Sequence, residues 1–330
     1  MRFRLQPTPA QEEALLEHCA HARFVWNLAV EQHQHWRPGR ASAPGYGEQA
    51  RQLTEARRAF AWLSAGSQTR FRWSRAIHDE VKSFRVTRDR AGRWHAAFAV
   101  IPPPVSGPGT GEVVGVDRGV VVSAALSTGE LLSVPGLRDG EAKRAERLQR
   151  SLARAKWGSN RRQRVKAAIA RLKARETDRR KDWVEKTSSD LAHRFDVIRV
   201  EDLKIKNMVC SARGTMEAPG RNVWAKAGLN RSIHAAGWGQ LVARLQDKAP
   251  GRVEKIDPAY TSQTCSACGH CAAQSRESRA AFRCRACGHA DYADVNAARN
   301  IAVGRTVTAR GGRPLGRPVN REPQLVPSSA

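Results

Sequence analysis

The first hundred residues show hydrophobic patterns typical of short strands and helices. Phe3 and Leu5 lie on one side of a short strand predicted at 1–6. The segment Thr8-Pro9-Ala10-Gln11 then combines an N-cap, a proline in the first turn and a capping box, so a helix begins there. A second helix near 50–60 and a strand hairpin at 81–100 complete this part.

A proline- and glycine-rich stretch, Pro102 to Gly111, is typical of a linker and divides the chain. We expect an N-terminal domain at 1–104, a larger domain at 111–303 and a disordered tail at 304–330, which is rich in Gly, Pro and Arg. The elements expected after the linker are a strand hairpin at 113–126, two helices within 138–195 interrupted at Gly158-Ser159, a strand at 196–201, a helix at 229–249, a strand at 253–256 and a helix at 294–303.

Residues 138–181 form the most basic segment, with 17 Lys and Arg against 5 Asp and Glu. Its apolar positions fall at helical spacing, which predicts a helical hairpin that is apolar inside and basic outside. A merely solvated face is the alternative, although such faces usually mix both signs. The residues expected to bind nucleic acid are Arg161, Arg162, Arg164, Lys166, Lys204 and Lys206.

Net charge supports a polyanionic partner. The 330 residues carry 57 Lys and Arg against 31 Asp and Glu, a formal charge of +26, which favours nucleic acid. No apolar run has the length of a membrane span, and the N-terminus lacks the apolar core of a signal peptide. We therefore expect no membrane partner and a cytoplasmic, nucleoid-associated protein.

Four of the seven cysteines form two Cys-x-x-Cys pairs, Cys265/Cys268 and Cys284/Cys287. Two such knuckles can complete a tetrahedron of thiolates around one structural zinc ion. Four free thiols are the alternative. The nearby side chains His270, Cys271 and His289 are extra candidate ligands that we expect to be bystanders.

Three acidic residues lie at the ends of predicted strands or at the start of a predicted helix. Asp117 and Glu201 each end an apolar strand, and Asp294 opens the last helix. Three carboxylates that meet repel one another unless divalent cations neutralise them. Each alone is a weak signal, because an acidic residue after a strand usually caps a helix or pairs with a base. Together they predict a site for two Mg²⁺ ions beside a phosphodiester.

At these residues the chain resembles the TnpB family, the transposon-encoded relatives of the type V CRISPR effectors. The resemblance rests on motifs that occur in the same order, namely Arg-Leu-Gln-Pro-Thr-Pro-Ala-Gln (4–11), Val-Gly-Val-Asp-Arg-Gly-Val (114–120), Val-Glu-Asp-Leu-Lys-Ile-Lys-Asn-Met (200–208), Gly-Leu-Asn-Arg-Ser-Ile (228–233), Tyr-Thr-Ser-Gln-Thr-Cys-Ser-Ala-Cys-Gly (260–269) and Asp-Val-Asn-Ala-Ala-Arg-Asn-Ile (294–301).

The resemblance implies a RuvC-like nuclease domain of RNase H type, with a mixed sheet and a zinc-ribbon insertion at 260–290. It implies a smaller α+β domain before it, with a wedge-type β-barrel and helices. It also implies a guide RNA encoded at the transposon end and a double-stranded target DNA. The catalytic triad would be Asp117, Glu201 and Asp294. One departure is that the stretch after Ala65 passes directly to Phe71, so the recognition helices look shortened.

The leading functional prediction is an RNA-guided, Mg²⁺-dependent DNA endonuclease of a transposable element. One alternative is a catalytically weak or non-cleaving nucleic-acid binder, acting as a repressor or transposition accessory protein. The other is a strand-transferring transposase, since RNase H-type folds also host that reaction. The sequence gives neither the guide nor the target-adjacent motif.

Overall fold

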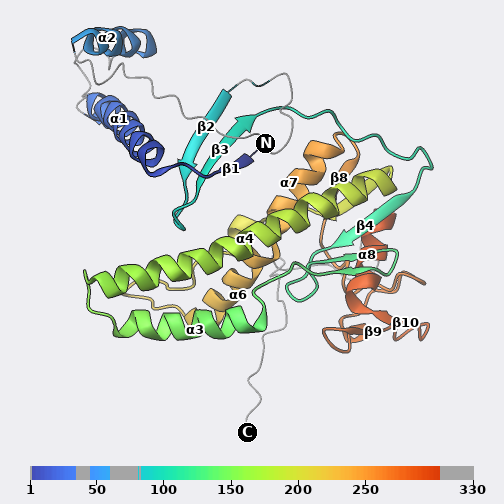
Figure 1. The fold of residues 1–330 in the computed structure, drawn as a ribbon. Helices are drawn as coiled ribbons and strands as arrows, with labels where there is room; N and C mark the ends of the chain where they lie inside the picture. Colours follow the sequence, from blue (N-terminus) through green and yellow to red (C-terminus); the bar gives the residue numbers. More distant parts are fainter. Residues whose placement is uncertain (1, 35–44, 60–80, 82, 305–330) are drawn as a thin grey trace. The chain divides into compact units, whose positions relative to one another are not determined.

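The computed structural model describes residues 2–34, 45–59, 81 and 83–304. The chain forms two compact units (Figure 1). One unit comprises residues 1–102 and 144–174, and the other comprises 103–143 and 175–330. None of the described helices combines the length and the apolar character needed to cross a bilayer.

The first unit contains a three-stranded antiparallel sheet in the order β1-β3-β2, with β1 at Arg2–Leu5, β2 at Ser83–Arg88 and β3 at Trp94–Ala99. Leu5, Trp94 and Ala96 from this sheet bury their side chains with Leu15 of helix α1. The predicted strand and hairpin are therefore confirmed. Of the expected wedge-type barrel, the described residues show these three strands.

Helices α1 (Pro9–Gln34) and α2 (Tyr46–Ala59) follow β1 in the chain. The predicted capping box is present, since Thr8 N donates to Gln11 Oε1 at 3.0 Å and Gln11 N donates to Thr8 Oγ1 at 3.4 Å. The shortened stretch predicted after Ala65 lies outside the described residues, as does the predicted tail at 304–330 except for Gly304.

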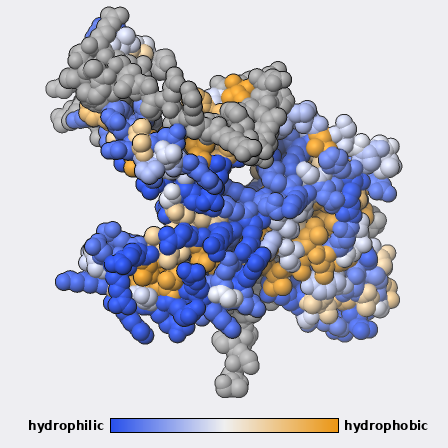
Figure 2. All heavy atoms as spheres, in the orientation of Figure 1, coloured by the Kyte–Doolittle hydropathy of each residue, from blue (hydrophilic) through white to orange (hydrophobic). Residues whose placement is uncertain are grey.

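The predicted basic hairpin is formed by α3 (Asp139–Arg154) and the 35-residue α4 (Asn160–Arg194), which are joined at Gly158 in the left-handed conformation. No residue of α3 is fully buried. Figure 2 shows a predominantly hydrophilic surface over this hairpin. The two helices are therefore as the sequence predicted. The apolar residues at helical spacing on α3 are half-buried rather than enclosed in a core.

The second unit is built on a five-stranded sheet in the order β6-β5-β4-β7-β8. Its strands are β4 (Val113–Asp117), β5 (Ala124–Leu126), β6 (Leu131–Leu132), β7 (Val197–Glu201) and β8 (Val253–Ile256). The first three strands form an antiparallel meander, and β7 and β8 then pair in parallel on the other side of β4. This strand order and direction are those of the RNase H-like fold, as predicted.

The two faces of this sheet are covered differently. On one face, Val114 and Val116 of β4 and Ile198 and Val200 of β7 are fully buried in a core with the C-terminal half of α4 and with α7. On the other face, helix α8 (Ala293–Val303) lies against β4. Because side chains alternate between faces along a strand, the odd-numbered residues of β4 and β7 point toward α8.

The helix predicted at 229–249 is two helices, α6 (Val223–Ala236) and α7 (Trp238–Lys248). They are separated by Gly237, which has φ of +70° and is therefore in the left-handed region that glycine adopts without strain. The prediction of one continuous helix was wrong because the apolar periodicity continues across the break. Trp238 and Leu241 remain buried, as the periodicity indicated.

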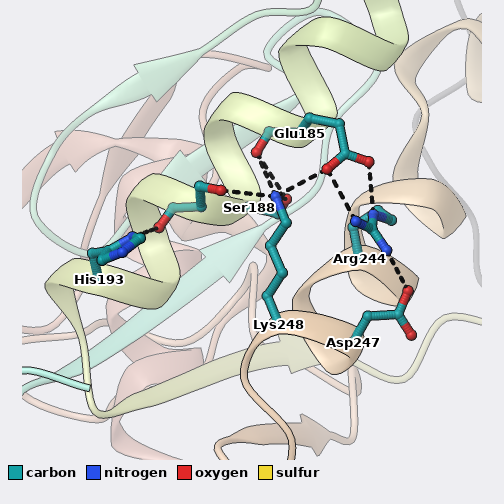
Figure 3. A network of polar contacts seen from close by, with 7 residues as sticks. Glu185, Ser188, His193, Arg244, Asp247 and Lys248 are labelled. Carbon is teal, nitrogen blue, oxygen red and sulfur yellow. Dashed lines mark hydrogen bonds and ion pairs between the residues drawn. The ribbon is translucent and has the colours of Figure 1, made fainter. Parts of the chain in front are cut away.

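A polar network attaches α4 to α7 (Figure 3). The ammonium of Lys248, with 12% of its side chain exposed, donates to Glu185 O at 2.7 Å, Ser188 Oγ at 2.9 Å and Ser189 Oγ at 2.8 Å. Arg244 adds a bidentate ion pair with the Glu185 carboxylate. The network satisfies a cation that the packing of the two helices encloses.

We expect Lys248→Met to lower the free energy of unfolding by about 1–3 kcal/mol, because its hydrogen-bond partners lose their donor while the methylene stem is kept. Denaturant titration measures the change. Lys186→Met is the matched control, since Lys186 is 76% exposed in its ion pair with Asp182 and should change stability by less than about 0.5 kcal/mol. Equal effects of the two substitutions would contradict this role of Lys248.

Candidate functional site

Asp117 and Glu201 lie at the ends of neighbouring parallel strands. Val116 of β4 is in register with Val200 of β7, so the next residues, Asp117 and Glu201, are also neighbours. Parallel strands lie about 4.8 Å apart, and residues in register point to the same face. Both carboxylates therefore lie on the face of the sheet that α8 covers.

Asp294 reaches the same place because α8 lies unusually close to β4. A Cβ atom at Gly115 would be 2.0 Å from Ala298 O and 2.4 Å from Ala302 N, so only glycine fits there. Asp294 precedes Ala298 by four residues, about 6 Å along a helix. Asp117 follows Gly115 by two residues, about 7 Å along a strand. The matching lengths bring the Asp294 carboxylate level with Asp117.

The pKa of Asp117 responds to the charges of both other carboxylates. Burial, followed by the charges of Glu201 and Asp294, raises the pKa of Asp117 well above its ordinary value. Burial likewise raises the pKa of Asp294, and Arg276 opposes that rise. The three acidic side chains are therefore neighbours at this edge of the sheet.

Arg276 is a residue of this site that the sequence did not single out. Its Nη2 lies 3.2 Å from Asp294 Oδ1, and its positive charge opposes the rise in the pKa of Asp117. The guanidinium also donates to Arg279 O at 3.3 Å, while its Nε is buried without a hydrogen-bond partner. The metal loop, the zinc-ribbon insertion at 260–290, holds four arginines, at 276, 279, 283 and 285, and nothing in the sequence distinguishes Arg276 from the other three.

Several contacts hold the strand ends in place. Buried Arg118 donates through Nη2 to Glu201 O, which connects the end of β4 to the end of β7. Thr261 Oγ1 donates to Glu201 Oε1 at 2.9 Å, and Trp238 Nε1 donates to Gly119 O at 3.0 Å. The Thr261 contact orients the Glu201 carboxylate, and the Trp238 contact holds the loop that follows Asp117.

Asn296 and Asn300 connect helix α8 to the segment around the first cysteine pair. Asn296 Nδ2 donates to Thr264 O at 2.7 Å, and Asn300 Nδ2 donates to Thr261 O at 2.8 Å. Asn296 Oδ1 also accepts from Ser266 N at 2.9 Å. Both side chains are buried and attach the start of the metal loop to α8.

The metal loop contains two knuckles with the same backbone geometry. Gly269 N donates to Cys265 O and Gly288 N donates to Cys284 O, and both glycines are left-handed, with φ of +75° and +73°. A 3₁₀ turn, η2 (Ala273–Ser275), and a two-stranded ribbon, β9 (Ala281–Arg283) with β10 (Ala290–Tyr292), connect the knuckles to each other and to α8.

The four thiols fit a zinc ion. Cys265 Sγ lies 3.8 Å from Cys287 Sγ, and Cys268 Sγ lies 3.6 Å from Cys284 Sγ. A tetrahedron with Zn–S bonds of about 2.3 Å has sulfur–sulfur edges of about 3.8 Å, which matches both distances. The cluster therefore has the donor set and the size of a structural zinc site, and Cys271 and the two histidines are not members of it.

The residues predicted to bind nucleic acid are placed on two elements. Arg161, Arg164 and Lys166 are exposed near the start of α4, whereas Arg162 donates to Leu152 O and Ala155 O and so helps to close the hairpin. Lys204 pairs with Asp202 just after β7, and Lys206 is exposed on the short α5 (Ile205–Met208). Their binding roles stay predictions.

Comparison with known proteins decides the family. Residues 99–212 match a family described as a probable transposase of the OrfB type, residues 238–301 match the Cas12f1-like TNB domain, and residues 1–40 match a helix-turn-helix domain. The putative RNA-guided DNA endonuclease InsQ of Escherichia coli (strain K12) is 40% identical over 262 residues. The chain belongs to the TnpB family. The resemblance derived from the sequence motifs is confirmed.

A second relative and one solved structure are also similar to parts of this chain. A putative RNA-guided DNA endonuclease of Streptomyces pristinaespiralis is 32% identical over 73% of this chain. The Cas12f1–sgRNA–target DNA complex matches 66% of this chain and 55% of that chain at 19% identity, with a TM-score of 0.35. The InsQ match covers 77% of this chain, and the chain spans 64% of InsQ and 58% of the Streptomyces protein. TnpB family members of this kind are therefore longer than the matched part of this chain.

We expect the purified chain to carry one zinc ion, held by the four-cysteine cluster. Cys284→Ala should lose the zinc, because three thiolates do not complete the tetrahedron, and metal analysis by mass spectrometry measures the content. Cys271→Ala is the matched control, as its thiol lies in the same loop outside the cluster. Zinc retained in Cys284→Ala, or lost in Cys271→Ala, would exclude this cluster as the site.

We expect Asp117→Asn to raise the melting temperature of the chain in the presence of a chelator. The raised pKa of Asp117 means that the folded chain binds a proton that the unfolded chain releases near pH 4, so wild-type stability falls as pH rises from there through the raised pKa. The amide removes this loss. Thermal unfolding at several pH values measures it, and a pH dependence unchanged by the substitution would contradict the carboxylate cluster.

Proposed function

We propose that this chain is an RNA-guided DNA endonuclease that hydrolyses phosphodiesters with divalent metal ions. The observation that carries the proposal is the meeting of Asp117, Glu201 and Asp294 on one face of an RNase H-like sheet. The names of the relatives support the substrate class, since two of them are described as RNA-guided DNA endonucleases.

The donor set suits Mg²⁺. Carboxylate oxygens are the hard ligands that Mg²⁺ prefers, and the charges of Glu201 and Asp294 that help to raise the pKa of Asp117 are those that a bound cation would neutralise. Asp117, Glu201 and Asp294 would hold the ions. When bound, Mg²⁺ lowers the pKa of an attacking water and stabilises the leaving 3′-oxygen of the nucleic acid.

The protein groups position the reacting strand and the carboxylates. Thr261 donates to Glu201 Oε1, which fixes the orientation of that carboxylate at the end of β7. Arg276 is the cation beside Asp294, and a phosphate oxygen could replace that carboxylate as its partner. Arg118 keeps the two strand ends together by its bond to Glu201 O.

The guide RNA and the double-stranded target are the proposed partners. A net charge of +26 supports binding of a long polyanion, and it carries no sequence information. Base pairing with a guide would supply that information, while the protein holds the duplex by its shape and phosphates.

We expect Asp117→Ala to reduce target cleavage by at least roughly 100-fold, because ligands of a catalytic metal support several kcal/mol of transition-state stabilisation. The assay uses the chain copurified with RNA from its own locus, a matching plasmid, and Mg²⁺ or a chelator. Asp202→Asn is the matched control, since Asp202 directly follows Glu201 in the chain but forms an ion pair with Lys204 and is not one of the three clustered carboxylates.

Cleavage by Asp117→Ala at the wild-type rate would refute the assignment of the triad. RNA and DNA binding without cleavage in the wild-type chain would favour the non-cleaving binder, and joined products with transposon-end DNA would favour a transposase.

A further inference from the structure

Trp157 is a large aromatic side chain that the fold leaves in solvent. It lies in the turn between α3 and α4, next to the left-handed Gly158, and is 81% exposed. The residue at this turn contributes nothing to a core, and full burial of a tryptophan would have stabilised the fold. The proposed chemistry of the carboxylate site does not use it.

Two cations hold the ring in a defined orientation. Arg162 Cζ lies 4.8 Å from the centre of the Trp157 ring, and Lys166 Nζ lies 5.4 Å from it. Arg162 is itself fixed, because its Nη1 donates to Leu152 O and Ala155 O at the end of α3. Arg162 and Lys166 are four residues apart on α4 and therefore share one face of that helix, and most of the surface of Trp157 stays open.

The surroundings of the ring are uniformly basic. From Arg147 to Lys173 the chain carries ten Lys and Arg and no Asp or Glu. Arg161 and Arg164 are exposed next to the ring-supporting Arg162, and neither has an acidic partner within the described residues. A protein partner that covers an aromatic residue here would have to be strongly acidic, whereas nucleic acid supplies both a negative backbone and flat bases.

We propose that Trp157 is a stacking platform for an unpaired base of single-stranded nucleic acid, with Arg161 and Arg164 binding the adjacent phosphates. A cation on one side of the ring and a base on the other is a favourable sandwich, because the ring offers its π-face to both. Stacking accepts every base, so the platform adds affinity for unpaired strands without selecting a sequence. This inference rests on the proposed binding of nucleic acid and is independent of cleavage.

Fluorescence anisotropy of the full chain with labelled 15-nucleotide oligo(U), oligo(dT) and a 15-base-pair duplex tests the platform. Trp157→Ala should weaken binding to the single strands by about 5- to 150-fold, the range for loss of one stacked base, whereas Trp157→Phe should change it by less than about threefold. The duplex affinity should hardly change. Trp224→Ala is the matched control, since Trp224 of α6 is 88% exposed in the other unit, and its loss should change affinity by less than about twofold.

Salt dependence separates stacking from binding to phosphates. Trp157→Ala should lower the affinity at every salt concentration with an unchanged slope, whereas Arg161→Ala with Arg164→Ala should reduce the slope by about 0.7 for each phosphate that the chain no longer neutralises. Stacking of a base on Trp157 should quench its intrinsic fluorescence. Trp157→Phe removes this one of the nine tryptophans, so the fluorescence quenching on binding should be smaller in that variant.

The results distinguish the two proposals. Wild-type single-strand affinity in Trp157→Ala, or an equal loss in Trp224→Ala, would overturn the platform and leave the proposed function intact. A wild-type chain that binds no nucleic acid at moderate salt would overturn both. Tighter binding of oligo(U) than oligo(dT) would assign the platform to an RNA strand, and equal binding would assign it to either strand. A loss for the duplex equal to that for single strands would reduce Trp157 to a general contact and overturn the stacking proposal.

Discussion

The close contact between α8 and β4 at Gly115 is the constraint on which the candidate active site depends. A side chain at this position would overlap the backbone of Ala298 and Ala302, so the helix can lie on the strand only where glycine stands. That contact sets the distance of α8 from the sheet and the level of Asp294 against Asp117. The same helix fixes the metal loop through Asn296. One backbone contact therefore positions both a proposed catalytic carboxylate and the zinc ribbon.

The site is assembled at a cost to stability. A desolvated carboxyl group beside two others favours its protonated form, which is why the pKa of Asp117 is raised. Arg276 offsets part of that repulsion and comes from the metal loop rather than from the sheet. The ribbon thus contributes a cation to the carboxylates as well as a folded insertion. Sites that work against local stability in this way are typical of functional residues.

The sequence predicted the features that short-range chemistry determines. Strand ends at Asp117 and Glu201, the capping box at Thr8 and the cysteine knuckles each depend on residues a few positions apart, and all are found as expected. What it missed depends on packing between distant segments. Arg276 is one of four arginines in its loop, and only the folded ribbon brings it to Asp294. The break at Gly237 was hidden because apolar spacing continues through it.

The distribution of charge bears on the proposed role of a guide strand. Exposed arginines such as Arg161 and Arg164 would bind phosphates of any sequence, and a stacked base on Trp157 would be accepted whatever its identity. The carboxylates would act on the phosphodiester backbone, which is the same at every position. None of these groups reads base edges, so they give affinity and chemistry without selecting a target. A nuclease with this surface could discriminate between targets if a bound RNA supplied the pairing, since pairing rather than protein contact would then carry the sequence information.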